Sequence, residues 1–457
     1  MYSDTIAAVS TAPMKAGISV IRVSGNETKN IIKKIFFSPD GKERGELEPR
    51  RAYYGLIKKD GRVADDVLLT FFAAPHSYTG EDSCEIGCHG GTSVTALVLS
   101  AVFAAGAVQA GPGEFTRRAV VNGRMSLSKA EGIARLLDAP TDEAAFMASS
   151  LARGALGERL EKISEKLLKT VSSLYAAIDY PEEDMEELSD DETRRAVADC
   201  ADDCRALIDS NHAASAVMDG VRTVIAGKPN AGKSSLFNLL IGEEKAIVTS
   251  AEGTTRDVIE YPVKAGRVLL RLCDTAGLRE KSRDAIELIG IERAKKLVFE
   301  DPEALVLALF DGSAPPAKED IDLCAGLSGR ERVIPVVTKS DAGLRNETLD
   351  AARSLGEPSV VSSVTGEGKE GLLERIEALC LGGAASESPL YLEQRQLASV
   401  RAALDALTEA LDALDSGLKD AAGASCERAL GALTEADGRG VSQKIVDDIF
   451  SRFCVGK

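Results

Sequence analysis

The sequence predicts a multidomain protein that combines α/β and all-helical parts, and three patterns along the chain support this prediction. Short β-like runs separated by turn residues fill residues 1–119, which predicts an α+β domain. Apolar residues recur at helical spacing in 120–216, for example at Leu160, Ile163, Leu167 and Leu168, and again in 382–457, which predicts a helical domain in two halves. Between them, 217–381 alternates strand-like and helix-like segments, as in a parallel sheet covered on both faces. We therefore expect this α/β domain to be an insertion in the helical one.

Composition and charge narrow the class of protein. The chain has 457 residues, of which 44% are hydrophobic and 28% charged, as expected for two to four globular domains. A net charge of −17 argues against holding RNA by bulk electrostatics, so a local patch or a partner must do so. Nine cysteines without a visible signal peptide favour reduced thiols and a cytoplasmic location. The most apolar run, 94–110, is short for a membrane span, and we expect a buried helix there.

The first motif with a defined chemistry is GKPNAGKS at 227–234, which has the form GxxxxGK[ST]. It follows the apolar run 221–226 and precedes the helix-like segment 235–240, the context that a phosphate-binding loop requires. Backbone N–H groups of such a loop can surround nucleotide phosphates, while Lys233 can reach the terminal phosphates and Ser234 can bind Mg²⁺. The predicted contacts are Asn230, Ala231, Gly232, Lys233, Ser234 and Ser235.

Two downstream segments match the order found in a GTPase. Asp274-Thr275-Ala276-Gly277 ends the apolar strand 268–273, where the carboxylate can hold Mg²⁺ through water and the glycine N–H can meet the γ-phosphate. Between the loop and this strand, a threonine hydroxyl such as that of Thr255 can complete the metal shell only while triphosphate is bound, which predicts a switch. The predicted contacts of this segment are Thr249, Ser250, Ala251, Glu252, Gly253, Thr254 and Thr255.

Base selection is assigned to Thr338-Lys339-Ser340-Asp341, which follows the strand-like run 332–337. A carboxylate there can accept both N–H groups of guanine, whereas adenine offers no matching pair of donors. The element resembles the NKxD sequence of translation-factor-like GTPases, with threonine in place of asparagine, a change that weakens a stabilising contact rather than the base reading. Ser362-Ser363-Val364 resembles the last guanine element, SAK, in part. Each element alone could be an ordinary turn or helix cap, but four in this order predict GTP binding.

The sequence lacks a familiar catalytic group. Leu278 follows Asp274-Thr275-Ala276-Gly277, where Ras-like enzymes place the glutamine that orients water. The usual device for the developing charge, an arginine finger, contributes roughly 10³–10⁵ in rate. Some other group must therefore replace both functions if hydrolysis is to be useful.

Four further motifs resemble those of the tRNA wobble-uridine modification GTPases, the family called MnmE or TrmE. They are Thr79-Gly80-Glu81-Asp82, Gly87-Cys88-His89-Gly90-Gly91, GPGEFTRRA at 111–119 and the terminal Phe453-Cys454-Val455-Gly456-Lys457. The resemblance runs from end to end. It implies a cytoplasmic, K⁺-dependent GTPase that acts with a flavin-dependent partner (MnmG, also called GidA). Together they would add an aminomethyl or carboxymethylaminomethyl group to carbon 5 of the wobble uridine in tRNA.

The resemblance also implies a fold and a second ligand. It implies a folate-binding-like N-terminal domain that forms a homodimer, a helical domain and an inserted P-loop GTPase domain. The folate would be 5-formyl-tetrahydrofolate or a related one-carbon carrier, and the positions matching the family's contacts are Arg22, Glu85, Arg124 and Lys457. A carboxylate such as Glu85 can grip the guanidine-like edge of a pterin. Arg124 stands where the family usually has lysine, and 11–17 is poorer in glycine than the family pattern.

Family members replace the arginine finger with K⁺, bound by the asparagine of the phosphate-binding loop. Here that residue is Asn230, which would otherwise be read as a turn residue, and Thr249, Ala251 and Thr254 match the positions that supply further oxygens. Glu287 is the best match to the glutamate that orients water. The resemblance thus assigns catalysis to Lys233, Asn230 and Glu287. Cys454 beside Lys457 could be a nucleophile for the modification chemistry, or simply a buried terminal cysteine.

Two other functions remain open from the sequence. A ribosome-assembly GTPase would need an RNA-binding module or a basic tail, and a regulatory switch would bind GDP tightly and need exchange factors. Nucleotide release rates would separate these classes. Cys84 and Cys88, with His89 adjacent, could contribute to a metal site, but zinc would need a fourth ligand and a tighter grouping.

Overall fold

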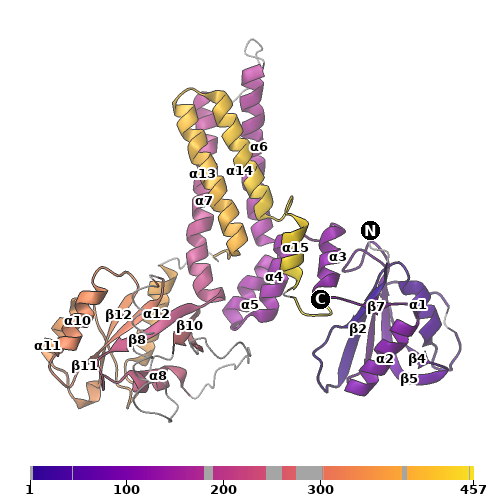
Figure 1. Ribbon diagram of the computed structural model, residues 1–457, viewed down its shortest axis with the longest axis horizontal. Helices are drawn as coiled ribbons and strands as arrows, with labels where there is room; N and C mark the ends of the chain where they lie inside the picture. Colours follow the sequence, from indigo (N-terminus) through magenta and orange to yellow (C-terminus); the bar gives the residue numbers. More distant parts are fainter. Residues whose placement is uncertain are drawn as a thin grey trace. The chain divides into compact units, whose positions relative to one another are not determined.

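The computed structural model describes residues 4–43, 45–179, 189–242, 260–273, 301, 303–382, 389–451 and 453–457. The chain divides into two compact units, each assembled from segments that are distant in sequence (Figure 1). One unit comprises Met1–Ala134, Ala152–Val197 and Asp405–Lys457, and the other comprises Arg135–Leu151 and Ala198–Leu404.

The first unit begins with a seven-stranded sheet of order β3-β4-β5-β6-β2-β1-β7. Neighbouring strands are antiparallel except for the parallel pair β1–β7. The strands are β1 Ile6–Val9, β2 Ile18–Ser24, β3 Phe36–Phe37, β4 Ala52–Lys59, β5 Arg62–Phe72, β6 Ser83–His89 and β7 Val108–Gln109. Helices α1 (Thr28–Ile35) and α2 (Thr92–Ala104) pack on this sheet. The α+β prediction for this region is confirmed in its secondary structure.

Alternation along the strands separates a covered face from an open one. In β5, Val67, Leu69 and Phe71 are buried in the core with α1 and α2, as strand geometry requires of every second side chain. The intervening Leu68 is 56% exposed. Strand register pairs Leu68 with Tyr54 on one side and Gly87 on the other, so the open face carries large apolar side chains.

The predicted buried helix at 94–110 ends earlier than expected. Helix α2 stops at Ala104, and Gly106, with φ of 126°, turns the chain into strand β7. Four residues of α2 are buried (Thr95, Val98, Ala101 and Val102). Among the described residues, none of the helices is long and apolar enough to cross a membrane.

Helices make up most of the remainder of the first unit. Helix α6 (Ala155–Asp179) buries Leu160, Ile163 and Leu167 at helical spacing and packs against α14 (Lys419–Ala436). The prediction of a helical region is confirmed, but Leu168, placed on the apolar face from the sequence, is 53% exposed. Helices α3 Glu114–Val121 and α15 Gln443–Ser451 also belong to this unit, whereas α4 Leu127–Asp138, α5 Asp142–Arg153, α7 Asp190–Met218 and α13 Gln394–Asp415 contribute residues to both units.

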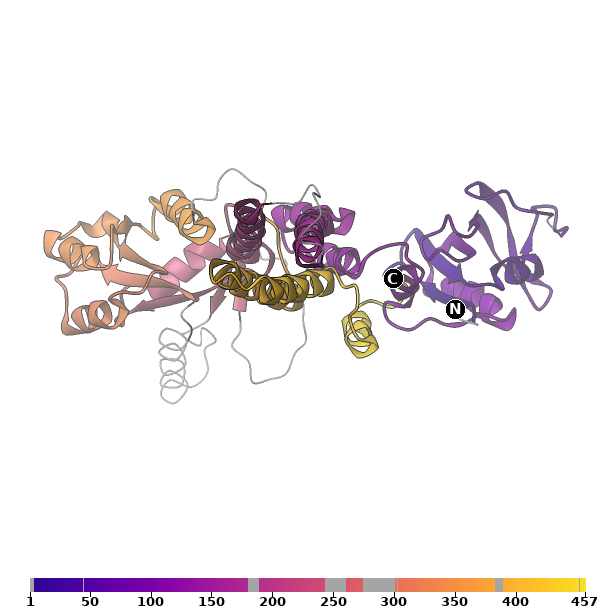
Figure 2. The same ribbon diagram turned by 90° about the horizontal axis from the view of Figure 1, so that it is seen from above.

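The second unit contains a six-stranded sheet of order β13-β12-β11-β8-β10-β9, parallel except for β9. The strands are β8 Val221–Gly227, β9 Glu260–Ala265, β10 Val268–Cys273, β11 Leu305–Asp311, β12 Val333–Thr338 and β13 Ser359–Val360. Every residue of the central strand β11 is buried, so helices cover both faces (Figure 2). The helices are α8 Lys233–Ile241, α10 Lys318–Leu327, α11 Asn346–Arg353 and α12 Lys369–Leu381, with the 3₁₀ turn η1 Ser340–Ala342.

A charged cluster joins the two connections that lead into and out of this sheet. Arg135 donates to Glu393 (2.6 and 2.8 Å), to Asp219 (2.8 Å) and to the Tyr391 hydroxyl (2.6 Å). Asp219 lies just before β8, whereas Tyr391 and Glu393 lie just before α13. The cluster therefore fixes the ends of the segment that carries the nucleotide motifs.

Candidate functional site

The phosphate-binding loop joins the end of β8 to the start of α8. Asn230 has φ of 64° and Gly232 has φ of 93°, so the loop makes two left-handed turns before α8 begins at Lys233. A Cβ atom on Gly232 would lie 3.4 Å from the Thr338 hydroxyl oxygen. The first turn of a helix leaves N–H groups without intrahelical partners, and this end of α8 therefore suits an anion.

The lysine of the loop is held by the loop's own backbone. Lys233 Nζ donates to the carbonyl oxygens of Gly227 (2.9 Å) and Lys228 (2.8 Å). Ala231 is buried, whereas Asn230 and Ser234 are exposed. The loop therefore keeps its ammonium group inside the turn and presents polar side chains on its open side, the arrangement that a bound phosphate and its metal need.

Thr338 connects the predicted base-selecting element to the predicted phosphate-binding loop. Its buried hydroxyl lies 2.7 Å from the carbonyl oxygen of Ala231 and 3.1 Å from that of Phe310. A hydroxyl has one proton, so it donates to one of these oxygens at a time. Threonine at this position thus retains a link to the loop, of the kind worth about 1 kcal/mol.

The side chains of the base-selecting element are oriented from two sides. Ser362, which follows β13, donates to Asp341 Oδ1 at 2.6 Å, and Lys339 Nζ lies 2.6 Å from Asp311 Oδ2 at the end of β11. Burial acts to raise the pKa of Asp311, but hydrogen bonds from Lys339 and Ser313 outweigh it and hold that pKa below its usual value. These side chains all follow carboxyl ends of parallel strands, which meet at one edge of the sheet.

Among the remaining predicted contacts, Ser340 and Ser363 have buried hydroxyl groups, whereas the Val364 side chain is exposed. The hydroxyl oxygens of Ser340 and Ser363 are buried without a hydrogen-bond partner in the described part of the chain, and Val364 is 83% exposed. The predicted contacts at Thr249–Thr255, at Asp274–Gly277 and at Glu287 lie outside the described residues.

A second candidate site lies in the N-terminal domain, where register places Arg22 of β2 opposite Glu85 of β6. Arg22 donates to Glu85 Oε1 from Nε (3.2 Å) and Nη2 (2.8 Å). Its guanidinium carbon lies 5.1 Å from the ring centre of Tyr78 and 5.8 Å from that of Phe115, within cation–π range. The site thus combines a carboxylate, a cation and two aromatic rings.

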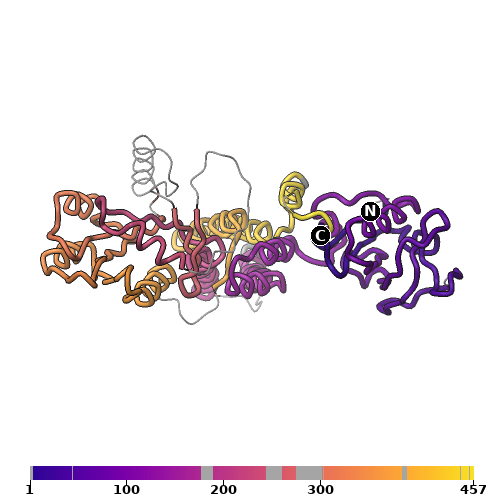
Figure 3. The backbone as a smooth tube through the Cα atoms, turned by 90° about the horizontal axis from the view of Figure 1, so that it is seen from below, coloured from indigo at the N-terminus to yellow at the C-terminus, as the bar shows by residue number. Residues whose placement is uncertain are grey.

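The C-terminal tail reaches the same region, and Figure 3 shows both chain ends at this domain. The Phe115 N–H donates to the carbonyl oxygen of Lys457 at 3.1 Å, and the Ser10 hydroxyl donates to that of Gly456 at 2.9 Å. Gly456 has φ of 98°, and a Cβ atom there would lie 2.3 Å from the Val9 carbonyl oxygen, so only glycine fits. Phe115 therefore contacts both Arg22 and the terminal lysine.

Arg124 approaches this region through Gly80, because a Cβ atom on that glycine would lie 3.1 Å from Arg124 Cγ. Arg22 therefore contacts Glu85, Tyr78 and Phe115, the Lys457 backbone contacts Phe115, and Arg124 lies at Gly80, two residues beyond Tyr78. Cys454, three positions before Lys457 in the tail, is exposed, so the buried alternative for this cysteine is wrong.

One residue of this site was not identified from the sequence. Arg118 is fully buried and bonds to Asp4 (3.0 Å), Glu114 (2.8 Å) and Glu81 (3.3 Å). It thereby joins the TGED and GPGEF motifs. The sequence offered one signal: an arginine within GPGEFTRRA, which contains Glu114, and a second acidic motif, TGED. The sequence does not reveal, however, that these two segments meet.

The three residues considered for a metal site do not converge. Cys84 and Cys88 are buried in the sheet core, whereas His89 is exposed and its Nδ1 lies 2.8 Å from Asp65 Oδ1. Adjacent strand residues point to opposite faces, which separates Cys88 from His89. Asp65, Asp66 and His89 offer ligand atoms within 4.8 Å of one another, but such a group near the surface does not by itself define a metal site.

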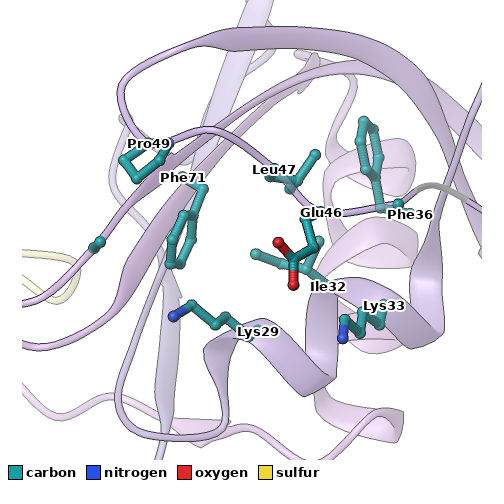
Figure 4. Close-up of a pocket in the computed structure, with 10 residues that line it drawn as sticks. Lys29, Ile32, Lys33, Phe36, Glu46, Leu47, Pro49 and Phe71 are labelled. Carbon is teal, nitrogen blue, oxygen red and sulfur yellow. The ribbon is translucent and has the colours of Figure 1, made fainter.

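A cavity of about 280 Å³ lies elsewhere in the N-terminal domain, between α1 and the segment 45–49. Figure 4 shows Lys29 and Lys33 on its α1 rim and the Glu46 carboxylate directed into it. Its lining residues include none of the folate contacts expected from the sequence, as far as the described residues show. The cavity and the Arg22–Glu85 site are therefore separate features.

Comparison with known proteins gives matches over nearly the whole chain. Residues 5–124 match the family described as GTP-binding protein TrmE N-terminus, and residues 127–454 match the MnmE helical domain. The tRNA modification GTPase MnmE of Alkaliphilus oremlandii is 36% identical over 465 residues and that of Symbiobacterium thermophilum 37% identical over 461 residues, with 100% of each chain covered. The same-named protein of Clostridioides difficile is 34% identical over 459 residues, with 99% of each chain covered.

Proposed function

The chain belongs to the MnmE family of tRNA modification GTPases, and from this premise we propose that it is K⁺-dependent and acts with a flavin-dependent partner. Its reaction would add an aminomethyl or carboxymethylaminomethyl group to carbon 5 of the tRNA wobble uridine. Family membership makes it a GTP hydrolase in tRNA modification, with GTP and Mg²⁺ as ligands and tRNA as substrate. The observation that carries the proposal is the Thr338–Ala231 hydrogen bond, which holds base-selecting and phosphate-binding elements at one sheet edge.

The nucleotide contacts follow from this edge. We assign the phosphates to the loop residues Asn230–Ser235, with Lys233 turning from its carbonyl partners toward the terminal phosphates. Ser234, exposed at the start of α8, would bind Mg²⁺ together with Thr255. Asp341 would accept the guanine N–H groups, and the hydrogen bond from Ser362 would orient its carboxylate. The other predicted contacts with the base are Lys339, Ser340, Ser363 and Val364.

For hydrolysis, Asn230 is the described residue that fits a K⁺ site. It lies at the exposed apex of the loop with its backbone in the left-handed conformation. Thr249, Ala251 and Thr254 would supply further oxygen ligands for K⁺. Glu287 would orient the attacking water indirectly. When bound there, K⁺ supplies the positive charge that an arginine finger supplies elsewhere. Equal hydrolysis rates in K⁺ and Na⁺ would contradict this assignment.

The N-terminal site fits a folate in its chemistry. Glu85 offers a carboxylate for the pterin edge, Tyr78 and Phe115 offer aromatic faces, and Arg22, Arg124 and Lys457 are cations suited to a glutamate tail. The ligand would be 5-formyl-tetrahydrofolate or a related one-carbon carrier. Cys454, exposed in the tail, is available for modification chemistry. Calorimetry with 5-formyl-tetrahydrofolate tests the site, and absence of binding would exclude it.

The open sheet face supports the homodimer. Ile18 is 67%, Leu68 56% and Tyr54 51% exposed, and register places them on one face. Contiguous exposed apolar side chains are typical of interaction surfaces. A second copy packing on this face would bury them. Light scattering on the wild-type chain and on Leu68→Asp tests this, because a wild-type monomer would exclude the dimer.

The function itself is tested on tRNA. We expect cytoplasmic tRNA from a strain lacking this gene to lose the carbon-5 group of the wobble uridine, as measured by mass spectrometry of nucleosides. The wild-type gene should restore it, together with the flavin-dependent partner, which would also contribute RNA contacts, since a net charge of −17 argues against holding RNA by bulk electrostatics. Complementation with Cys454→Ser separates a nucleophile from a spectator. Unchanged wobble nucleosides in the deletion strain would refute the proposal.

A further inference from the structure

The phosphate-binding loop carries a second lysine whose ammonium group does not point to the loop's own carbonyls. Lys228 Nζ lies 2.7 Å from Asp320 Oδ2, and the two side chains are 14% and 1% exposed. Asp320 is the third residue of α10. Its Oδ2 also accepts the N–H of Ala317, the residue before the helix, at 2.8 Å. One carboxylate oxygen thus holds both the loop and the start of α10.

The ion pair depends on both partners because Asp320 has few other contacts. Its Oδ1 is buried and has no hydrogen-bond partner within the described ranges. A buried carboxylate is costly unless it is paired, so Lys228 is the group that compensates its charge. The N-terminal end of α10 adds a favourable field at the same position. Lys228 is therefore confined to one direction, into the domain.

The tethered residue is also the one that holds the catalytic lysine. Lys233 Nζ donates to the carbonyl oxygens of Gly227 and Lys228, and these two bonds orient the ammonium group. Rotation of the Lys228 peptide would therefore displace it. The left-handed turns at Asn230 and Gly232 follow directly and share the same backbone. Movement at Lys228 would therefore change where the loop's N–H groups point.

We propose that Lys228 and Asp320 are positioning residues for phosphate binding. Their buried ion pair fixes the first turn of the loop, and thereby the Lys233 ammonium and the N–H groups that surround the phosphates. Neither residue touches the nucleotide in this scheme. The inference rests on the nucleotide site proposed above and extends it to a contact between the loop and α10. Preorganisation of such donors is a major part of how sites stabilise phosphate charge.

The test is Asp320→Asn, which keeps the size of the side chain and an acceptor for Ala317 but removes the charge. We expect the affinities for GTP and GDP to fall together about tenfold, which corresponds to about 1.4 kcal/mol. The affinity for guanosine, which has no phosphate, should stay unchanged. Calorimetry on the full chain, well below its unfolding temperature, measures all three. A variant that binds GTP and GDP as the wild type does would overturn the inference, as would an equal loss for guanosine.

Two further variants separate positioning from stability. Glu260→Gln removes a partner of Arg222 (3.1 Å) at the opposite end of β8, and we expect it to leave nucleotide affinity unchanged. Should Asp320→Asn fail to fold, Lys228→Met with Asp320→Leu removes both buried charges, a replacement that proteins often tolerate. Its GTP and GDP affinities should remain low while guanosine binds normally. Wild-type affinities in this double variant would refute positioning by the ion pair. If the wild type itself bound no GTP, the proposed nucleotide site would fail instead.

Discussion

The two candidate sites are built in different ways. In the nucleotide domain, the continuous loop at 227–234 meets Lys339, Asp341 and Ser362, which follow parallel strands, at one edge of the sheet. The predicted contacts with the phosphates come mainly from backbone groups of the loop. In the N-terminal domain, Arg22, Glu85, Arg124 and Lys457 come from four separate segments, including the last residue of the chain. A site made of backbone is encoded locally, whereas a site made of converging side chains is encoded by the whole fold.

The difference extends to what supports each site. Around the nucleotide loop, the supporting contacts are a hydroxyl from Thr338 and the Lys228–Asp320 ion pair. Around the N-terminal site, a fully buried Arg118 with three carboxylate partners holds two motifs together. Removing one partner of such a buried arginine should destabilise the fold strongly, because its charge stays desolvated. Substitutions should therefore affect the two activities separately.

The largest effect that tests this separation is expected for Lys233→Met. It removes the ammonium group that the loop orients, so we expect GTP hydrolysis to fall by about 10²–10³, the usual cost of removing one preorganised donor. Folate binding should be unchanged. Phosphate release in saturating GTP, Mg²⁺ and K⁺ measures the first quantity. Lys264→Met, at an exposed position of β9 in the same domain, is the matched control. Hydrolysis within threefold of wild type would contradict the assignment.

The sequence predicted the nucleotide domain better than the N-terminal one, for physical reasons. The apolar run at 268–273 became β10 with the same bounds, and the run at 221–226 became β8 with one residue more. A buried parallel strand is a continuous apolar run, so its limits are visible in sequence. The phosphate-binding loop was equally visible, because its glycine and lysine spacing states the chemistry.

What sequence reasoning missed involves residues that meet only after folding. Asp320 belongs to an ordinary-looking polar stretch and Arg118 to a motif noted for its family resemblance, and nothing local indicates that either side chain is buried. Leu168 was assigned to the apolar face of α6, yet the buried residues of that face, such as Leu167, lie next to it and its own side chain is exposed. The helix expected to continue to Ala110 ended because Gly106 turns the chain toward β1, a pairing that no periodicity encodes. Family resemblance, not pattern, predicted the folate contacts.

A smaller effect is expected for Glu85→Gln in the N-terminal site. The change removes the charge that Arg22 contacts and that a pterin edge would need, a hydrogen bond worth about 1.5–3 kcal/mol when charged. We expect the affinity for 5-formyl-tetrahydrofolate to fall about 10- to 150-fold with GTP hydrolysis unaltered. Calorimetry measures the affinity, with Glu48→Gln, which removes an exposed ion pair of the same domain, as control. Parallel loss of hydrolysis would mean that the two sites are not separable.

The smallest effect concerns pH, to which the two domains should respond in opposite directions. Hydrogen bonding to Asp65, and then the charges of Asp65 and Asp66, raise the pKa of His89 above its ordinary value. The stabilisation by protonated His89 is therefore complete below pH of about 6.5 and is lost as pH rises through the raised pKa. The lowered pKa of Asp311 has the reverse consequence, since its contribution is complete above pH of about 4 and is lost on acidification.

Between pH 5.5 and 8.5, only the His89 contribution should therefore change. We expect a small decrease in the unfolding temperature of the wild type relative to His89→Gln across this range, with the two converging at the alkaline end. His89 is 64% exposed, so solvent screening keeps the shift slight. Scanning calorimetry of both proteins, with Asp311→Asn as the comparison, measures it. The difference between Asp311→Asn and the wild type should stay constant over the same range, because Asp311 is ionised throughout. A His89 effect that is independent of pH would show that the imidazole contributes by packing and hydrogen bonding alone.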